Sequence, residues 1–353
     1  MIKEYGYEYD AVLNEELYLK TKGKVTHNNF MGALCLRTGR DALKVVAREF
    51  TKSIVLIPAL ACDSMITPFK KYNHVIKYYK LNRDYSIDVE YLSSLIPDKV
   101  SPILFLYMDY FGNKALNDSQ LNELKSNYPN LIFIEDRTHN LFVDNKRQFK
   151  ADFTIASLRK WVNIPDGGLL WTNKKLVNKE FSEDLNFFES RLKAQCLRNE
   201  FFKTGDELTK ISYRKVFSTV TDSIDEDLLP GLMSEYSREL LKQIDFTLIN
   251  ETRKKNASIL ISELKGFNFV QKKVGLGDVY VAILIENRDK IQRELASKSI
   301  FCTIIWPLSD EQKEICRIAK YTEEHILTIY CDQRYTSEDM EYVAKCIRRI
   351  CNE

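Results

Sequence analysis

The sequence has little glycine, few histidines and no closely paired cysteines. Its 353 residues include 12 glycines and four histidines, and none of its eight cysteines forms a Cys-x-x-Cys pair. It also contains no Gly-x-Gly-x-x-Gly run and no Gly-x-x-x-x-Gly-Lys-Ser/Thr run, which argues against a Rossmann dinucleotide enzyme and a P-loop ATPase. The scattered cysteines and scarce histidines argue against a zinc site and favour reduced thiols, as in a cytoplasm.

Excess charge and long apolar segments are absent too. The 52 basic and 50 acidic residues nearly cancel, so neither nucleic acid nor an anionic membrane is the implied partner. No apolar run approaches the roughly 20 residues that a membrane span needs. The charged start of the chain lacks the apolar core of a signal peptide. We therefore expect a cytoplasmic protein.

Short apolar runs alternate with amphipathic segments in the first half of the chain. This alternation predicts βα units and a mostly parallel sheet with helices on both faces. The predicted strands are 53–58, 74–79, 101–107, 153–156, 169–172 and one that begins at Leu131, and the predicted helices are 63–72, 121–128 and one that begins near Thr38.

The second half of the chain predicts a smaller α/β unit. Residues 173–230 are charged and helical in pattern, and 233–264 form one long amphipathic stretch that suits a linking helix. The last helix has Thr336 and Asp339 at capping-box spacing. We expect a large domain at 1–235 and a small one at 236–353. The small one has predicted strands at 279–285 and 301–306 and predicted helices at 289–297 and 337–351.

The functional prediction depends on Lys160 and Asp136. Asp136 ends an apolar strand, at the edge of an α/β sheet where ligands bind. Lys160 follows the next strand, 24 residues later, ahead of a Pro-Asp-Gly-Gly corner. A desolvated lysine amine is nucleophilic, and a carboxylate can keep a pyridine nitrogen protonated. The pair fits pyridoxal 5′-phosphate (PLP), in which the lysine forms the imine and the acid supports the electron sink.

A possible anion site begins one of the predicted helices. Thr38, Gly39 and Arg40 offer a hydroxyl, free backbone N–H groups and a cation at a helix N-terminus. The same residues also suit an ordinary helix cap, and the spacing alone does not separate the two readings.

Taken in order, seven stretches resemble the DegT/StrS-type family of PLP-dependent sugar aminotransferases, over most of the chain from about Leu36. They are TGRDAL at 38–43, IPALACDSMITPF at 57–69, the run 80–88, Tyr110-Phe-Gly112, Glu135-Asp136 with His139, Lys160 with Gly167-Gly168, and Cys331-Asp-Gln-Arg-Tyr335. The resemblance implies the type I aspartate-aminotransferase fold. It also implies a homodimer whose active sites lie at the subunit interface.

The resemblance also implies a role for each site residue. Lys160 would bond to the cofactor and carry the substrate proton, and Asp136 would pair with the pyridinium nitrogen. Thr38, Gly39 and Arg40 would hold the phosphate, with His139 beside the ring or its hydroxyl.

Three positions depart from the family pattern. Ile155 stands where the family has a phosphate-binding serine, while Ser157 lies two residues further on. Cys62 stands where an aromatic residue covers the ring, and Pro230-Gly-Leu-Met233 replaces an Asn-x-Arg-Met run. We retain Cys62 and Ser157 as cofactor-binding candidates. Arg198, Tyr213 and Arg214 are the candidates for residues that reach the phosphate of a second subunit.

The implied reaction moves an amino group from a donor such as glutamate onto a keto-sugar, which we expect to be nucleotide-linked, in surface-polysaccharide or amino-sugar synthesis. One alternative is a PLP-dependent sugar dehydratase, which Lys160 argues against because such members carry histidine there. The other is a PLP-fold protein that has lost turnover and binds a ligand as a regulator.

Overall fold

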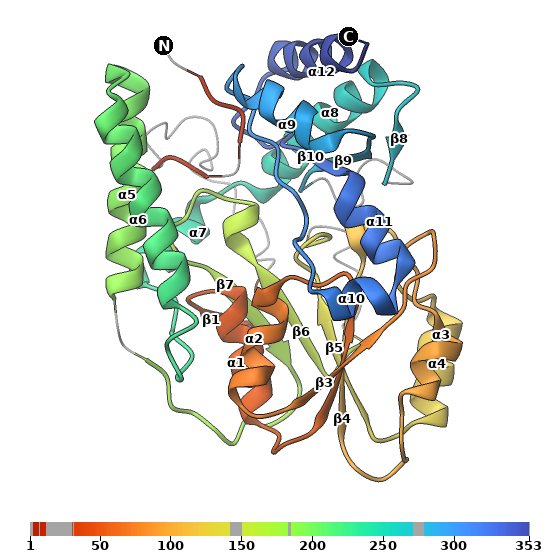
Figure 1. The fold of residues 1–353 in the computed structure, drawn as a ribbon. Coiled ribbons are helices and arrows are strands. Elements are labelled where there is room, and N and C mark those ends of the chain that lie inside the picture. Colours follow the sequence, from red (N-terminus) through yellow and green to blue (C-terminus); the bar gives the residue numbers. More distant parts are fainter. Residues whose placement is uncertain are drawn as a thin grey trace.

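The computed structural model describes residues 3–6, 8–11, 30, 32–141, 150–182, 185–270 and 279–352. A large sheet with helices on both sides forms the lower part of the molecule in Figure 1, and a small sheet with its own helices forms the upper part. The predicted α/β class, with a large unit and a smaller C-terminal one, is confirmed. The boundary between 1–235 and 236–353 stays a prediction.

The large sheet has seven strands in the order β1-β7-β6-β5-β4-β2-β3. The five from β3 to β6 are parallel, and β7 runs antiparallel to both of its neighbours. All six residues of β4 are buried, as expected for a parallel strand covered on both faces. The strands are β1 (Leu34–Leu36), β2 (Ile54–Pro58), β3 (Val75–Tyr79), β4 (Ile103–Met108), β5 (Leu131–Asp136), β6 (Phe153–Ser157) and β7 (Gly168–Thr172).

Helices α1 (Gly39–Arg48), α2 (Asp63–Lys71), α3 (Val89–Ser94) and α4 (Asp118–Asn127) connect the first strands. Thr38 caps α1, because its side chain accepts a hydrogen bond from the Asp41 N–H, as polar N-cap residues do. The buried face of α1 packs on β6 and β7. The N-terminus of α1 therefore lies at the edge where β6 ends.

Two long helices, α5 (Asn186–Thr204) and α6 (Glu207–Ser223), form an antiparallel hairpin at the left of Figure 1. The predicted single stretch 233–264 is wrong. It is two helices, α7 (Glu235–Gln243) and α8 (Phe246–Glu263). The break occurs because Ile244 is extended and the Asp245 carboxylate caps α8 at the Thr247 and Leu248 N–H groups.

The small sheet is antiparallel, in the order β10-β9-β8. The predicted strand at 301–306 is wrong, since that segment makes only an isolated bridge, Thr303 to Thr328, and its start pairs with the N-terminal segment through Tyr5 and Ile300. The Thr336/Asp339 capping box is confirmed. The remaining elements are β8 (Asn268–Phe269), β9 (Val281–Leu284), α9 (Arg288–Ala296), α10 (Asp310–Ile315), α11 (Arg317–His325), β10 (Ile326–Ile329) and α12 (Ser337–Asn352).

The largest buried cluster of the described residues spans both sheets, and two smaller ones lie at the α5–α6 hairpin. Within the described residues, we find no helix with the length and apolar character that crossing a bilayer requires.

Gly168 is a position where the fold tolerates no side chain. A Cβ there would lie 2.1 Å from the Thr38 carbonyl oxygen and 2.7 Å from the Gly39 nitrogen, and neither backbone atom can move without displacing α1. We predict that Gly168→Ala lowers the free energy of unfolding by about 3 kcal/mol, at the upper end of overpacking costs. Gly39→Ala is the control, because its nearest contact is the Ser157 Cβ at 3.3 Å. Equal urea denaturation midpoints for the two variants would contradict this prediction.

Candidate functional site

A cavity of about 140 Å³ lies where β5 and β6 end and α1 begins. The carboxyl ends of parallel strands and a helix N-terminus thus converge on one space, which is where α/β folds bind ligands. It is lined by Gly39, Arg40, Leu43, Cys62, Ser64, Met65, Met108, Asp136, Thr138, Ile155, Ser157, Arg159, Lys160, Thr221 and Trp306.

Six of the eight predicted site residues line this cavity, namely Gly39, Arg40, Cys62, Asp136, Ser157 and Lys160. Thr38 is fully buried behind it, and its hydroxyl donates to the Asp41 carboxylate at 2.7 Å. His139 is also fully buried, and its ring centroid lies 4.9 Å from that of Phe111 and 5.8 Å from that of Trp306.

Asp136 ends β5 inside the protein, 6% exposed. Burial raises the pKa of its carboxyl above the ordinary value, while hydrogen bonds from Thr138 and the charge of Lys160 oppose that rise. Its Oδ1 accepts the Thr138 N–H at 2.8 Å. An opposite charge placed near this carboxylate is therefore favoured, because it offsets the cost of burial.

Thr138 joins the ends of β5 and β6, and sequence reasoning missed it. Its hydroxyl accepts the Ser157 N–H at 3.1 Å, and its carbonyl accepts the Trp161 indole N–H at 2.7 Å. The only signal in the sequence is its place between Asp136 and His139. These bonds hold the strand end that carries the acid against the strand end that leads to the lysine.

Lys160 ends a 3₁₀ turn, Leu158–Lys160, that directly follows β6. Its Nζ lies 5.9 Å from the centroid of the Trp306 ring. Asp166 holds the turn that follows Lys160 against the start of α7. Its carboxylate accepts hydrogen bonds from the Ser234 N–H at 2.6 Å and the Ser234 hydroxyl at 2.7 Å. Trp306 had no local signal, because it comes from a segment about 150 positions away in the chain.

Arg40 makes its hydrogen bonds on the side of the cavity that α6 covers. Its Nη1 donates to the Thr221 carbonyl and to the Asp225 carboxylate, both at 3.0 Å. A buried network behind it fixes the segment that follows α6. Arg37 bonds to Asp41 and Asp227 at 3.0 and 2.6 Å, and the Lys44 amine donates to the Ile224 carbonyl at 2.7 Å.

The Pro230–Met233 segment packs against this network within its own chain. The Gly231 N–H donates to Asp41 at 3.2 Å, its carbonyl accepts the Arg37 N–H at 2.8 Å, and a Cβ on Gly231 would lie 2.6 Å from the Arg37 Nε.

Arg198 and Tyr213 are also held within the chain, since Arg198 binds the buried Glu4 carboxylate at 3.1 Å and the Tyr213 hydroxyl donates to it at 3.3 Å. Arg214 is exposed, and it remains the candidate for contact with a second subunit.

The cavity carries an excess of positive charge. Arg40, Arg159 and Lys160 line it, and Asp136 is the carboxylate among its lining residues. Neutral imidazole is the favoured form of His139, because burial and then the charge of Lys160 lower its pKa well below the ordinary value. The arrangement suits an anionic ligand that also carries a group able to pair with Asp136.

The sequence matches no protein-family model and none of the curated proteins. Solved structures do match, and aminotransferases of the DegT DnrJ EryC1 StrS type are among them. PseC of Helicobacter pylori, an aminotransferase of pseudoaminic acid biosynthesis, is 14% identical, with a TM-score of 0.64 over 99% of this chain and all of PseC.

Two further structures match to the same degree. NtdA of Bacillus subtilis, solved with bound pyridoxamine phosphate (PMP), is 14% identical, with a TM-score of 0.64 over 91% of this chain and 73% of NtdA. DesI, solved with its TDP-sugar product, is 15% identical, with a TM-score of 0.64 over 92% of this chain and 82% of DesI. The chain has the sugar-aminotransferase fold. This confirms the fold that the sequence resemblance implied.

We predict that Asp136→Asn stabilises the protein at neutral pH. Because the folded-state pKa is raised, the ionised form costs stability, and the cost grows as pH rises from about 4, the unfolded value, through the folded one. The gain from Asn should therefore vanish as pH falls to about 4. Urea denaturation from pH 4 to 7 measures it.

Asp206→Asn is the control with the opposite sign. Hydrogen bonds from Thr209 lower the pKa of this exposed helix cap, so its ionised form stabilises the fold at neutral pH and loses that effect as pH falls. A loss of stability in Asp136→Asn that does not change with pH would contradict the raised pKa of Asp136 in the folded protein.

Proposed function

We propose that this protein is a PLP-dependent aminotransferase that transfers an amino group to a keto-sugar. The observation that carries the proposal is the single cavity that holds Lys160, Asp136 and a cationic end formed by Arg40 and the first N–H groups of α1. The structures that share the fold include one with bound PMP and one with a TDP-sugar product. They support a nucleotide-linked keto-sugar as the acceptor.

The residues present fit the cofactor. Its phosphate is a dianion, and the cavity's three cations suit a ligand of that charge. We assign the phosphate to Gly39, Arg40 and Ser157, because all three face the cavity where α1 begins. When bound, PLP supplies an electron sink for charge that develops on the amino-bearing carbon.

The chain's own groups have distinct tasks in this assignment. The Asp136 carboxylate holds a positive ring nitrogen, because a buried carboxylate favours a cation beside it. The Lys160 amine holds the aldehyde end of the cofactor and then carries the proton at its Nζ. The His139 ring lies 5.8 Å from the Trp306 ring, and its Nε2 has no hydrogen-bond partner among the described residues. The assignment of His139 to the cofactor stays a prediction, because its ring is fully buried and does not line the cavity.

A regulatory, non-catalytic function is the second candidate. The Arg40–Asp225 ion pair favours it, because a carboxylate at 3.0 Å already partly neutralises the cation assigned to phosphate. The presence of Cys62 in place of an aromatic also favours it. Conversion of bound PLP to PMP by an amino donor such as glutamate separates the two, since only the aminotransferase converts it.

We predict that borohydride reduction of the PLP-loaded protein attaches the cofactor to Lys160. The amine lines the cavity beside Asp136, where the aldehyde would be held. Lys160→Ala should lose the adduct and keep the far-UV circular dichroism of the fold. The control is Lys174→Ala, at a lysine that pairs with Asp152 on the surface. Peptide mapping that places the label on another lysine overturns the assignment.

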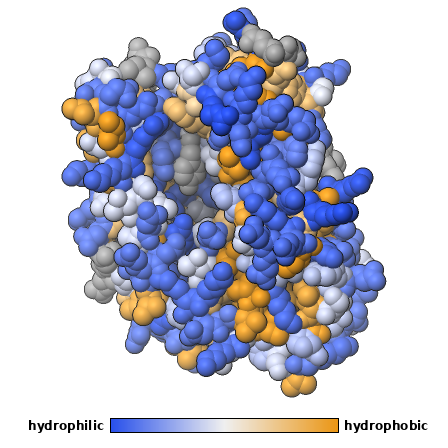
Figure 2. Space-filling view, in the orientation of Figure 1, coloured by the Kyte–Doolittle hydropathy of each residue, from blue (hydrophilic) through white to orange (hydrophobic). Residues whose placement is uncertain are grey.

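We further propose a two-fold homodimer that buries part of the α5–α6 hairpin. Leu208 and Ile211 on α6 are 73% and 61% exposed, and Figure 2 shows hydrophobic residues at the upper end of the hairpin. Apolar side chains so exposed on one helix face commonly mark an interface. Arg214 lies on the same helix and is our candidate for a contact across it.

The dimer has its own test in sedimentation with cofactor titration. Leu208→Glu should produce monomers and weaken PLP binding about tenfold, because the partner's contribution to the site is lost. Val100→Glu is the matched control, since Val100 is 86% exposed in a loop before β4. A wild-type monomer that binds PLP tightly would contradict the proposed assembly.

A further inference from the structure

Three buried side chains from distant parts of the chain hold the backbone that directly follows Lys160. The Lys160 carbonyl accepts hydrogen bonds from the Arg253 Nη2 at 3.2 Å and the Tyr9 hydroxyl at 3.4 Å. The Trp161 carbonyl accepts from the Arg253 Nη2 at 2.9 Å and the Gln333 Nε2 at 2.8 Å. We call Tyr9, Arg253 and Gln333 the carbonyl bracket.

The bracket residues also bind one another. The Arg253 Nη2 donates to the Tyr9 hydroxyl at 2.6 Å, and its Nε donates to the Gln333 Oε1 at 2.9 Å. Arg253 is fully buried, and Tyr9 and Gln333 are 6% and 5% exposed. A buried guanidinium is costly unless its N–H groups are bonded. Here its Nη2 donates to both carbonyls of the lysine turn.

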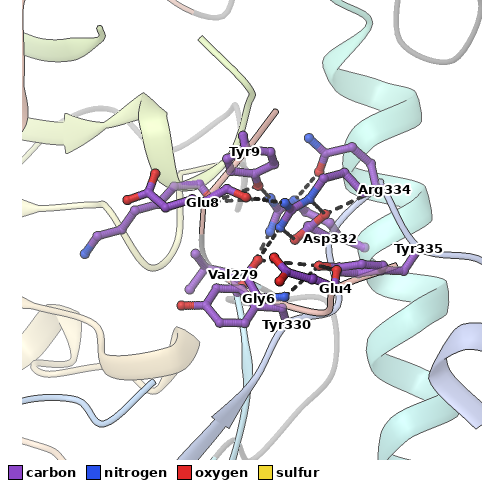
Figure 3. A network of polar contacts seen from close by, with 12 residues as sticks. Glu4, Gly6, Glu8, Tyr9, Val279, Tyr330, Asp332, Arg334 and Tyr335 are labelled. Atoms are coloured by element: carbon purple, nitrogen blue, oxygen red, sulfur yellow. Dashed lines mark hydrogen bonds and ion pairs between the residues drawn. The ribbon is translucent and has the colours of Figure 1, made fainter. Parts of the chain in front are cut away.

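Tyr9 is held in place by a second arginine. The Arg334 guanidinium stacks on the Tyr9 ring at 4.2 Å and donates to the Gly6 and Glu8 carbonyls at 2.5 and 2.6 Å. The Asp332 carboxylate binds the same guanidinium through two bonds, both 2.8 Å. Figure 3 shows these groups converging on the N-terminal segment. Burial also raises the pKa of Tyr9 far above its ordinary value, so its hydroxyl stays a neutral donor.

We infer that the carbonyl bracket is a positioning device for Lys160. It fixes the two peptide planes that follow this residue, and peptide planes leave only φ and ψ free to redirect the side chain. The bracket therefore sets the direction from which Nζ enters the cavity. Misplacement of a reacting group by about 1 Å can cost roughly a hundredfold in rate. The inference rests on the proposed function, because it assumes that Lys160 bonds to PLP.

A test must separate positioning from ordinary packing, and two forms of the cofactor allow this. PLP has an aldehyde that bonds to a lysine amine, while PMP has the same ring and phosphate and cannot form that bond. Tyr9→Phe removes one hydroxyl and keeps the ring against Arg334. We expect it to weaken PLP binding and slow its covalent capture by about two- to tenfold, the value of one hydrogen bond, with PMP affinity unchanged.

Tyr335→Phe is the matched control. Tyr335 is equally buried and belongs to the same network, but its hydroxyl accepts the Gly6 N–H at 2.8 Å and faces the Glu4 and Gly6 carbonyls at 3.4 Å. We expect it to leave the ratio of PLP to PMP affinity as in the wild type. In a Lys160→Ala background, Tyr9→Phe should no longer change PLP affinity.

The outcomes distinguish the positioning role of the carbonyl bracket from the proposed function. Wild-type capture of PLP at Lys160 together with equal weakening of PLP and PMP binding in Tyr9→Phe overturns the bracket alone. An effect of Tyr9→Phe on PLP that persists without Lys160 also overturns it. A wild-type protein that captures no PLP overturns the proposed function and the bracket together.

Discussion

The site depends on the parallel pairing of β5 with β6. Register places Asp136 beside Ile155, and the Arg137 N–H extends the ladder to the Ile155 carbonyl at 2.8 Å. Strands in this register end together, so an acid at the end of one and a lysine just past the end of the other share one edge. The helix N-terminus reaches the same edge only because β7 has glycine where α1 passes.

The sequence was most informative where the apolar periodicity of a segment agrees with its place in the sheet. The strands β2 to β7 are short apolar runs between polar turns, so periodicity located them to within about two residues, whereas the three-residue strand β1 was not predicted. Asp136 and Gly39 were chosen because each lies at the end of such an element, whereas Ser157 was retained only because of the family resemblance. The roles assigned to these residues remain proposals.

The sequence was least informative where the structure depends on long-range contacts. Residues 301–306 are as apolar as a strand, but the start of this segment pairs with Tyr5 and β10 takes the place beside β9. Trp306 and Arg159 complete the cavity without any spacing that marks them. Thr38 carries the hydroxyl that a phosphate site needs, yet that hydroxyl binds Asp41. Whether a polar group faces a ligand or a neighbour is decided by packing, which a single sequence does not display.

The carbonyl bracket also bears on the order in which the protein is made. Tyr9 and Arg253 lie 244 residues apart, and Gln333 follows Arg253 by another 80. Synthesis proceeds from the N-terminus at about 5–20 residues per second, so the large sheet is complete well before the C-terminal residues leave the ribosome. A nascent chain can thus have Lys160 at the sheet edge while two of the three side chains that bond to its turn are still missing. The turn that carries Lys160 therefore gains all of its bracket hydrogen bonds only when the protein is nearly finished.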